Sequence, residues 1–201
     1  MTSVTSVVSI EQEQRYRASA YALLAALLRT PPDQAMLEYL TGLSDGGEPD
    51  GDELLLAMSG LALSAIHHST VAIDEEFHDL FIGLGKGEVA PYASWYLTGY
   101  LMEQPLSNLR TDLARLGFAR SEDITEPEDH AAALCEVVAI MIGDAVDLAV
   151  QREFFQSHMA DWLERFFEDL DRADSAVFYK SVACFGVAFV RLEKQYFSMH
   201  S

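Results

Sequence analysis

The chain has 201 residues and half of them are hydrophobic, so it is long enough to bury one sizeable core. Its formal net charge of -19 disfavours binding to nucleic acids and to anionic membranes, because both need clustered Lys and Arg. We therefore expect no nucleic-acid partner and no stable membrane insertion. The charge favours basic partners, although acidic residues also serve simply to keep an apolar chain soluble.

The cysteines and the N-terminus predict a soluble cytoplasmic protein. Cys135 and Cys184 lie in apolar helical patterns, so we expect both in the core and no disulfide framework. Residues 1–10 lack the basic and apolar regions of a secretory signal and are expected to be disordered. The longest apolar runs are too short to cross a bilayer.

Hydrophobic residues recur with helical spacing almost throughout, and no alternating strand pattern is present. The sequence therefore predicts an all-α fold with about nine helices in a single domain over residues 1–201. The helices are expected at residues 11–29, 33–40, 52–68, 74–83, 92–102, 105–116, 126–150, 153–170 and 175–197.

Two irregular segments, residues 83–91 and 117–127, interrupt the helical pattern. Either could act as a hinge between two lobes. A hinge would permit domain swapping, so both a monomer and a domain-swapped dimer are open.

The glycine-rich segment Gly83-Leu84-Gly85-Lys86-Gly87 suggests a phosphate-binding loop only superficially. A P-loop needs a glycine where this chain has Leu80, and a Ser or Thr where it has Gly87. A dinucleotide-binding fingerprint is also incomplete, because no strand precedes the loop. Binding of a guanine nucleotide through this segment is not expected.

A catalytic site is not expected either. Glu75 and His78 have the Glu-x-x-His spacing of di-iron bundles, but the chain has no second such pair. No nucleophile elbow is present, and neither cysteine has an activating context. We expect no metal and no enzymatic activity.

The segment Glu126-Pro127-Glu128-Asp129-His130 has two open interpretations. The carboxylates suit a helix start, and Thr125 and Glu128 have capping-box spacing. Alternatively, Asp129 and His130 lie at the mouth of a groove, where carboxylates could pair with guanidinium groups of a partner.

Aromatic residues offer a similar choice. The segment Pro91-Tyr92-Ala93-Ser94-Trp95-Tyr96 could be core, or it could form a recognition surface beside an irregular loop. Phe154, His158 and Trp162 lie four residues apart, which places them on one helix face. We expect this stripe to pack between helices, with His158 hydrogen-bonded.

The order and separation of these segments resemble the TorD/DmsD/NarJ family of molybdoenzyme maturation chaperones. The resemblance runs from about residue 15 to 197 and depends on Leu80-Phe81-x-Gly83, on Pro91-Tyr92-x-Ser94-x-Tyr96 and on residues 126–130. In that family, residues 126–130 are associated with leader-peptide recognition. Related sequences commonly carry an acidic residue where this chain has Ala93.

The resemblance implies an all-helical cytoplasmic chaperone without a resident cofactor. It would bind the twin-arginine leader and the apo form of a molybdenum oxidoreductase, delay export, and contact the molybdopterin guanine dinucleotide transiently during insertion. The residues expected to bind the client are Glu126, Pro127, Asp129, His130, Pro91, Tyr92, Ser94, Trp95 and Tyr96. The alternatives are a helical metal-carboxylate protein, a nucleotide-responsive adaptor, and an adaptor without a redox client.

Overall fold

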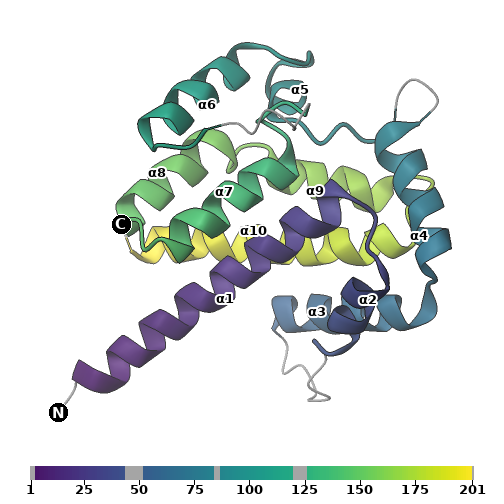
Figure 1. The fold of residues 1–201 in the computed structure, drawn as a ribbon, viewed down its shortest axis with the longest axis horizontal. Helices are drawn as coiled ribbons and strands as arrows, with labels where there is room; N and C mark the ends of the chain where they lie inside the picture. The colour runs from purple at the N-terminus through teal and green to yellow at the C-terminus, as the bar shows by residue number, and fades with distance from the viewer. Residues whose placement is uncertain (1–2, 44–51, 84–86, 120–125, 201) are drawn as a thin grey trace.

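The computed structural model describes residues 3–43, 52–83, 87–119 and 126–200, and over these ranges it contains helices and no strand (Figure 1). The all-α prediction is confirmed. The elements are α1 (Ser3–Arg29), α2 (Gln34–Thr41), α3 (Glu53–His67), α4 (Thr70–Phe77), the π-helical turn η1 (His78–Ile82), α5 (Ala93–Thr98), α6 (Gln104–Arg115), α7 (Ala131–Gly143), α8 (Leu148–His158), α9 (Leu163–Arg172) and α10 (Phe178–Met199).

Helix α1 begins at Ser3, where the sequence predicts disorder up to residue 10 and a helix from residue 11. Its first turns extend beyond the other helices (Figure 1). Once a helix has nucleated, adding a turn costs little, so a well-packed helix can continue past the residues that bury its apolar face.

Other helix boundaries differ from the prediction as well. Helix α4 begins at Thr70 instead of residue 74, because the Ser69 side chain accepts a hydrogen bond from the Ala72 amide. Helix α5 ends at Thr98 instead of residue 102, because Gly99 adopts a left-handed φ of 81°. Helix α7 ends at Gly143, well before residue 150.

The predicted helix over residues 153–170 is two helices, α8 and α9. The indole of Trp162 donates a 2.7 Å hydrogen bond to the backbone oxygen of His158, at the end of α8. Trp162 then occupies the cap position before α9. The predicted stripe is therefore wrong in its geometry, because only Phe154 and His158 share a helix. Its role in packing is confirmed, since Phe154, His158 and Trp162 are all buried.

One cluster of buried residues extends from α1 to α10 and forms the core. Helix α10 packs against α9 and α3, while α1 packs along α7. Gly186 permits the close approach of α10 to α9, since a Cβ there would lie 2.4 Å from the Phe167 ring. Cys135 is buried as predicted, but Cys184 is exposed, because it lies on the outer face of α10.

The two predicted hinge segments lie partly outside the described residues, so hinge motion stays a prediction. The described residues 87–91 of the first segment are hydrogen-bonded to other parts of the chain. The amides of Glu88 and Val89 donate to the backbone oxygens of Asp79 and Leu80, and Glu88 accepts hydrogen bonds from Ser175.

No single helix in the described ranges is long and apolar enough to cross a membrane. Helix α3 and the helical segment from Thr70 to Ile82 satisfy that criterion only as a pair, which is bent by 113°.

Two buried carboxylates connect helix α10 to α1 and to α4. Glu193 of α10 accepts hydrogen bonds from Arg17 at 2.7 Å and from the Tyr21 hydroxyl at 2.9 Å, which ties α10 to α1. Glu76 of α4 accepts from the backbone amides of Val177, Phe178 and Tyr179 at 2.7–3.0 Å. A carboxylate from another helix thus satisfies the unpaired amides at the start of α10.

We predict that Glu76→Ala lowers the free energy of unfolding by roughly 2–4 kcal/mol, because it leaves buried backbone amides of α10 without acceptors. Glu75→Ala is the matched control, since Glu75 is the exposed neighbour on the same helix. Urea denaturation of both variants measures the difference. Equal stability of the two variants would show that Glu76 does not cap α10.

Candidate functional site

The two sequence motifs meet in space as a short antiparallel contact between residues 91–94 and 129–131. The Ala131 amide donates to the Pro91 oxygen at 2.8 Å, and the Ala93 amide donates to the Asp129 oxygen at 3.0 Å. Tyr92 and His130 form the antiparallel bridge at the centre. Two segments about 35 residues apart in the sequence therefore lie side by side and are joined by hydrogen bonds.

The side chain of Asp129 stabilises this contact through hydrogen bonds to Ser94. Its side chain is buried, and its Oδ2 accepts hydrogen bonds from the Ser94 amide at 2.9 Å and from the Ser94 hydroxyl. Asp129 is therefore buried and does not line the same groove as His130, and its predicted role in client binding stays a prediction. The sequence could not show this, because the Ser94 groups that draw the carboxylate inward come from a distant segment.

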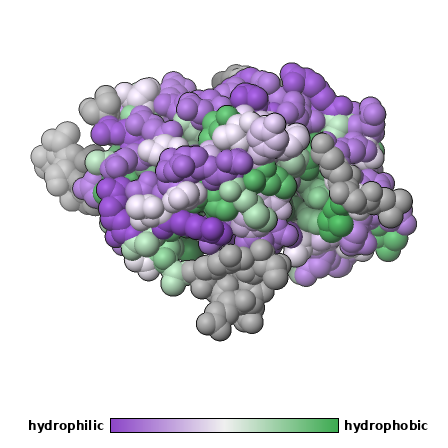
Figure 2. All heavy atoms as spheres, turned by 90° about the horizontal axis from the view of Figure 1, so that it is seen from above, coloured by the Kyte–Doolittle hydropathy of each residue, from purple (hydrophilic) through white to green (hydrophobic). Residues whose placement is uncertain are grey.

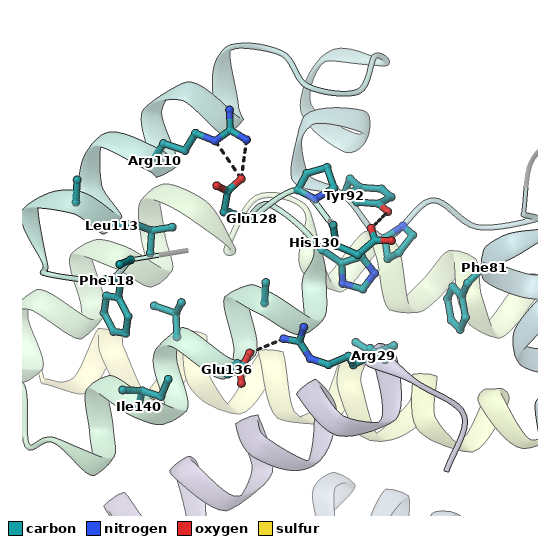
Figure 3. A pocket seen from close by; sticks show the side chains of 18 of the residues that line it. Arg29, Phe81, Tyr92, Arg110, Leu113, Phe118, Glu128, His130, Glu136 and Ile140 are labelled. Carbon is teal, nitrogen blue, oxygen red and sulfur yellow. Dashed lines mark hydrogen bonds and ion pairs between the residues drawn. The ribbon is translucent and has the colours of Figure 1, made fainter. Parts of the chain in front are cut away.

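Beside this contact lies a groove of about 480 Å³. It is bounded by the end of α1, by α4 and η1, by α6 and by α7 (Figure 3). Its apolar lining consists of Leu28, Phe77, Phe81, Ile82, Leu113, Phe118, Val137 and Ile140. Five residues predicted from the sequence line it too, namely Pro91, Tyr92, Glu126, Pro127 and His130.

The carboxylates around the groove are paired within the protein (Figure 3). Arg110 donates to Glu128 from Nε at 3.0 Å and from Nη2 at 2.8 Å. Arg29 pairs with Glu136, and the Tyr92 hydroxyl donates to Glu126. Burial and the adjacent Glu126 carboxylate raise the pKa of Tyr92, so this hydroxyl remains a donor.

His130 is a neutral hydrogen-bonding group in the groove wall. Burial lowers its pKa to about 4, although Glu126 acts in the opposite direction. Its Nδ1 accepts a 3.0 Å hydrogen bond from the Ala132 amide, so the ring caps α7 and carries its proton on Nε2. The predicted capping box placed the helix start near residue 126, which is wrong, because α7 begins at Ala131. Thr125 lies outside the described residues.

Ser94, Trp95 and Tyr96 do not line the groove. Ser94 is buried on Asp129, and Tyr96 stacks on Trp162 with ring centroids 5.6 Å apart. The Tyr96 hydroxyl donates to Asp169 at 3.0 Å. Tyr96 therefore takes part in the packing, and a role of Ser94, Trp95 and Tyr96 in client binding stays a prediction.

Sequence reasoning missed several groove residues. Arg29, Arg110 and Glu136 come from three helices, and no local pattern separates them from other surface charges. Phe77 and Phe81 had a weak signal, because two aromatic residues four positions apart share a helix face next to the irregular segment.

The described residues contain no group of three His, Cys, Asp or Glu side chains that could hold a metal ion. Glu75 is exposed, and the His78 ring bonds to the backbone oxygen of Asp74 at 2.8 Å. The glycine-rich segment lies partly outside the described residues, so its predicted lack of nucleotide binding stays a prediction.

We predict that His130 makes the fold sensitive to acid. A pKa lowered to about 4 in the folded protein, against an ordinary value near 6.5, means that the unfolded chain binds the extra proton. Stability from the neutral ring is complete above pH 6.5 and is lost as the pH falls toward 4. The loss between pH 7 and pH 5 amounts to about 2 kcal/mol.

The control is His130→Asn, which retains a capping side chain but does not titrate. Urea denaturation of both proteins at pH 7 and pH 5 should show a smaller loss for the variant. Parallel losses in the two proteins would mean that His130 is already charged in the folded state.

Comparison with known proteins agrees with the geometry. Residues 48–168 match the sequence model of the family described as nitrate reductase delta subunit. Relatives include a TorD chaperone of Vibrio atlanticus, 27% identical over 90% of this chain and 94% of its own, and one of Vibrio parahaemolyticus, 28% identical over 79% of each. A putative redox enzyme maturation protein from Archaeoglobus fulgidus has the same fold, with a TM-score of 0.58 and 18% identity over 89% of this chain and 93% of its own.

These relatives are chaperones and match 79–90% of the chain, so the predicted non-catalytic chaperone role is confirmed. The family match extends over more than half of the sequence and includes every groove-lining residue from α4 to α7, that is, all except Leu28 and Arg29 of α1. The chain therefore belongs to the nitrate reductase delta subunit family, which includes the TorD chaperones that its sequence resembles.

Proposed function

We propose that this protein is a cytoplasmic chaperone that binds the twin-arginine leader of an apo molybdenum oxidoreductase. It would delay export until the molybdopterin guanine dinucleotide has been inserted into the client. Such a chaperone works by differential affinity, because it binds the unfolded leader and cofactor-free client tightly and the folded client weakly.

The observation that carries the proposal is the groove with its apolar floor and polar mouth. A leader contains an arginine pair followed by an apolar run, so it needs an apolar surface beside hydrogen-bonding groups. Phe81, Leu113 and Ile140 supply the apolar surface, and the Nε2–H of His130 supplies a hydrogen-bond donor for a peptide carbonyl.

Exposed apolar surface outside the groove is consistent with a client that covers more than its leader. Seen from above, hydrophobic residues form patches between hydrophilic ones (Figure 2). Tyr100 and Met102 in the connection after α5 are 70% and 72% exposed. Large exposed apolar side chains of this kind are typical of surfaces that bind other proteins.

We place no resident cofactor in the groove. Contact with the molybdopterin guanine dinucleotide is proposed to be transient and to occur while the client is bound. The arginines at the groove, Arg29 and Arg110, are groups that could approach its phosphates, because guanidinium pairs well with phosphate oxygens.

We predict that Ile140→Gln weakens binding of a synthetic leader by about 5- to 30-fold, which corresponds to about 1–2 kcal/mol of lost apolar contact. Leu192→Gln is the matched control, since Leu192 is 41% exposed and Ile140 43%, but Leu192 lies outside the groove. Both variants should keep wild-type stability. Calorimetric titration with the leader measures the effect.

Two outcomes would contradict the proposal. The first is that the wild-type protein fails to bind the leader. The second is that Ile140→Gln and Leu192→Gln bind it equally well.

A further inference from the structure

Helix α3 has apolar side chains on its solvent-facing side as well as on the side that packs against α2 and α10. Leu55, Leu56, Leu63 and Ile66 are 49–60% exposed, and their spacing places them on one face of the helix. Residues 54–66 contain no charged side chain, although the whole chain has a net charge of -19. A helix that is apolar all round is normally buried on every side, so this face lacks a partner that would cover it.

A cavity of about 510 Å³ lies beside this face, between α3, α9 and α10. Leu56 and Gly60 of α3 line it, together with Cys184 and Val187 of α10. Charged side chains of α9 complete the lining. Apolar surface next to polar groups is the usual composition of a protein–protein interface, and the cavity has room for an apolar side chain from outside.

Gly60 is near the middle of the exposed face of α3. None of the described residues has an atom within 4 Å of the position that a Cβ of Gly60 would take. The packing of the chain itself therefore does not require a glycine here, although glycine destabilises a helix relative to alanine. Beside Ser59, which is also small, Gly60 does allow a second helix to approach closely.

The pattern on α3 is self-complementary, which favours a second copy of this chain as the partner. A two-fold axis between Ser59 and Gly60 would make the two α3 helices antiparallel. Leu56 and Leu63 are equally far from that axis along the helix, so Leu63 of each copy would meet Leu56 of the other, at the cavity.

Electrostatics favours the same arrangement. Two chains with a charge of -19 repel each other, but the uncharged face of α3 lets them meet without bringing carboxylates together. The antiparallel orientation sets the N-terminal end of each α3 beside the C-terminal end of the other, which is attractive. It also brings Asp52 at the start of one helix toward His67 at the end of the other.

We propose that two copies of this chain form a reversible dimer through the exposed face of α3. Leu63 of each copy enters the cavity beside Leu56 and Cys184 of the other. The face is of the size that buries less than about 1,200 Å² in total, which is typical of weak, transient interfaces. No helix is exchanged, so this dimer differs from a domain-swapped one.

The dimer leaves the groove free. None of the groove-lining residues belongs to α3. In Figure 1, α3 lies at the lower edge of the molecule, whereas α5 and α6 lie at the upper edge. Each copy in the dimer therefore keeps its own groove.

Sedimentation velocity between about 1 µM and about 1 mM covers the affinities of a weak interface. The mass of the wild-type protein should rise from monomer toward dimer over this range. Leu63→Asp should weaken association about 100-fold or more, because each dimer would bury two unpaired carboxylates. Leu101→Asp is the matched control, since it makes the same change at an exposed leucine after α5 and should dimerise like wild type.

Two results of this experiment would overturn the proposal. A wild-type protein that stays monomeric over the whole range would leave the face of α3 to a different protein. A dimer that Leu63→Asp does not weaken would be held by another surface or by domain swapping.

A cysteine cross-link tests the placement of Leu63 independently. Leu63→Cys puts a thiol opposite Cys184 of the second copy, so oxidised glutathione should produce a disulfide-linked dimer on a non-reducing gel. The two introduced thiols lie roughly 10 Å apart along the helices, too far to bridge each other. Leu63→Cys combined with Cys184→Ser should give no linked dimer, and neither should Leu101→Cys. Absence of the link in Leu63→Cys, or its persistence without Cys184, would overturn the proposed interface.

Discussion

The pairing of residues 91–94 with residues 129–131 is the constraint on which the rest of the site depends. Two backbone hydrogen bonds and the buried Asp129 carboxylate join segments that are far apart in the sequence. This contact places Tyr92 and His130 on one side, where they form the groove wall. It also places Asp129 in the lining of a separate cavity of about 450 Å³ between α5, α6 and the end of α8. A single hydrogen-bonded contact therefore shapes both the groove and this cavity.

The long helices hold this contact in position through other buried polar groups. Arg17 and Tyr21 of α1 bond to Glu193 of α10, and Glu76 of α4 caps α10. Breaking a buried pair of this kind costs more than the pair contributes, because the remaining partner stays unsatisfied in the interior. Helix α1 is thereby attached to α10 at Arg17 and Tyr21, and its C-terminal end carries Arg29 to the groove.

Much of the fold followed from the sequence. Helical spacing of apolar residues gave the fold class, and the predicted starts at residues 33 and 52 lie within one residue of α2 and α3, which Asp33 and Asp52 cap. The errors had tertiary causes. The indole of Trp162 bonds back to α8 and divides a segment whose hydrophobic pattern is continuous. The extension of α1 over residues 3–10 has no local signal of its own.

The site was predicted less completely, for a physical reason. The sequence motifs, read through the family resemblance, pointed to Tyr92, Glu126 and His130, and these three residues line the groove. They could not show that Asp129 turns inward to Ser94, that Tyr96 stacks on Trp162, or that Arg29 and Glu136 meet. Each of these outcomes depends on a partner from a distant segment, and sequence spacing carries no information about such partners.

The most direct test of the central claim is native-state hydrogen exchange of the Ala93, Ser94 and Ala131 amides. These three amides donate to the Asp129 oxygen, the Asp129 carboxylate and the Pro91 oxygen. If the contact is part of the cooperative core, they exchange only with global unfolding, and Asp129→Ala removes the protection of Ser94 first. Rapid exchange of all three in the wild-type protein, or unchanged protection of Ser94 in Asp129→Ala, would contradict the account.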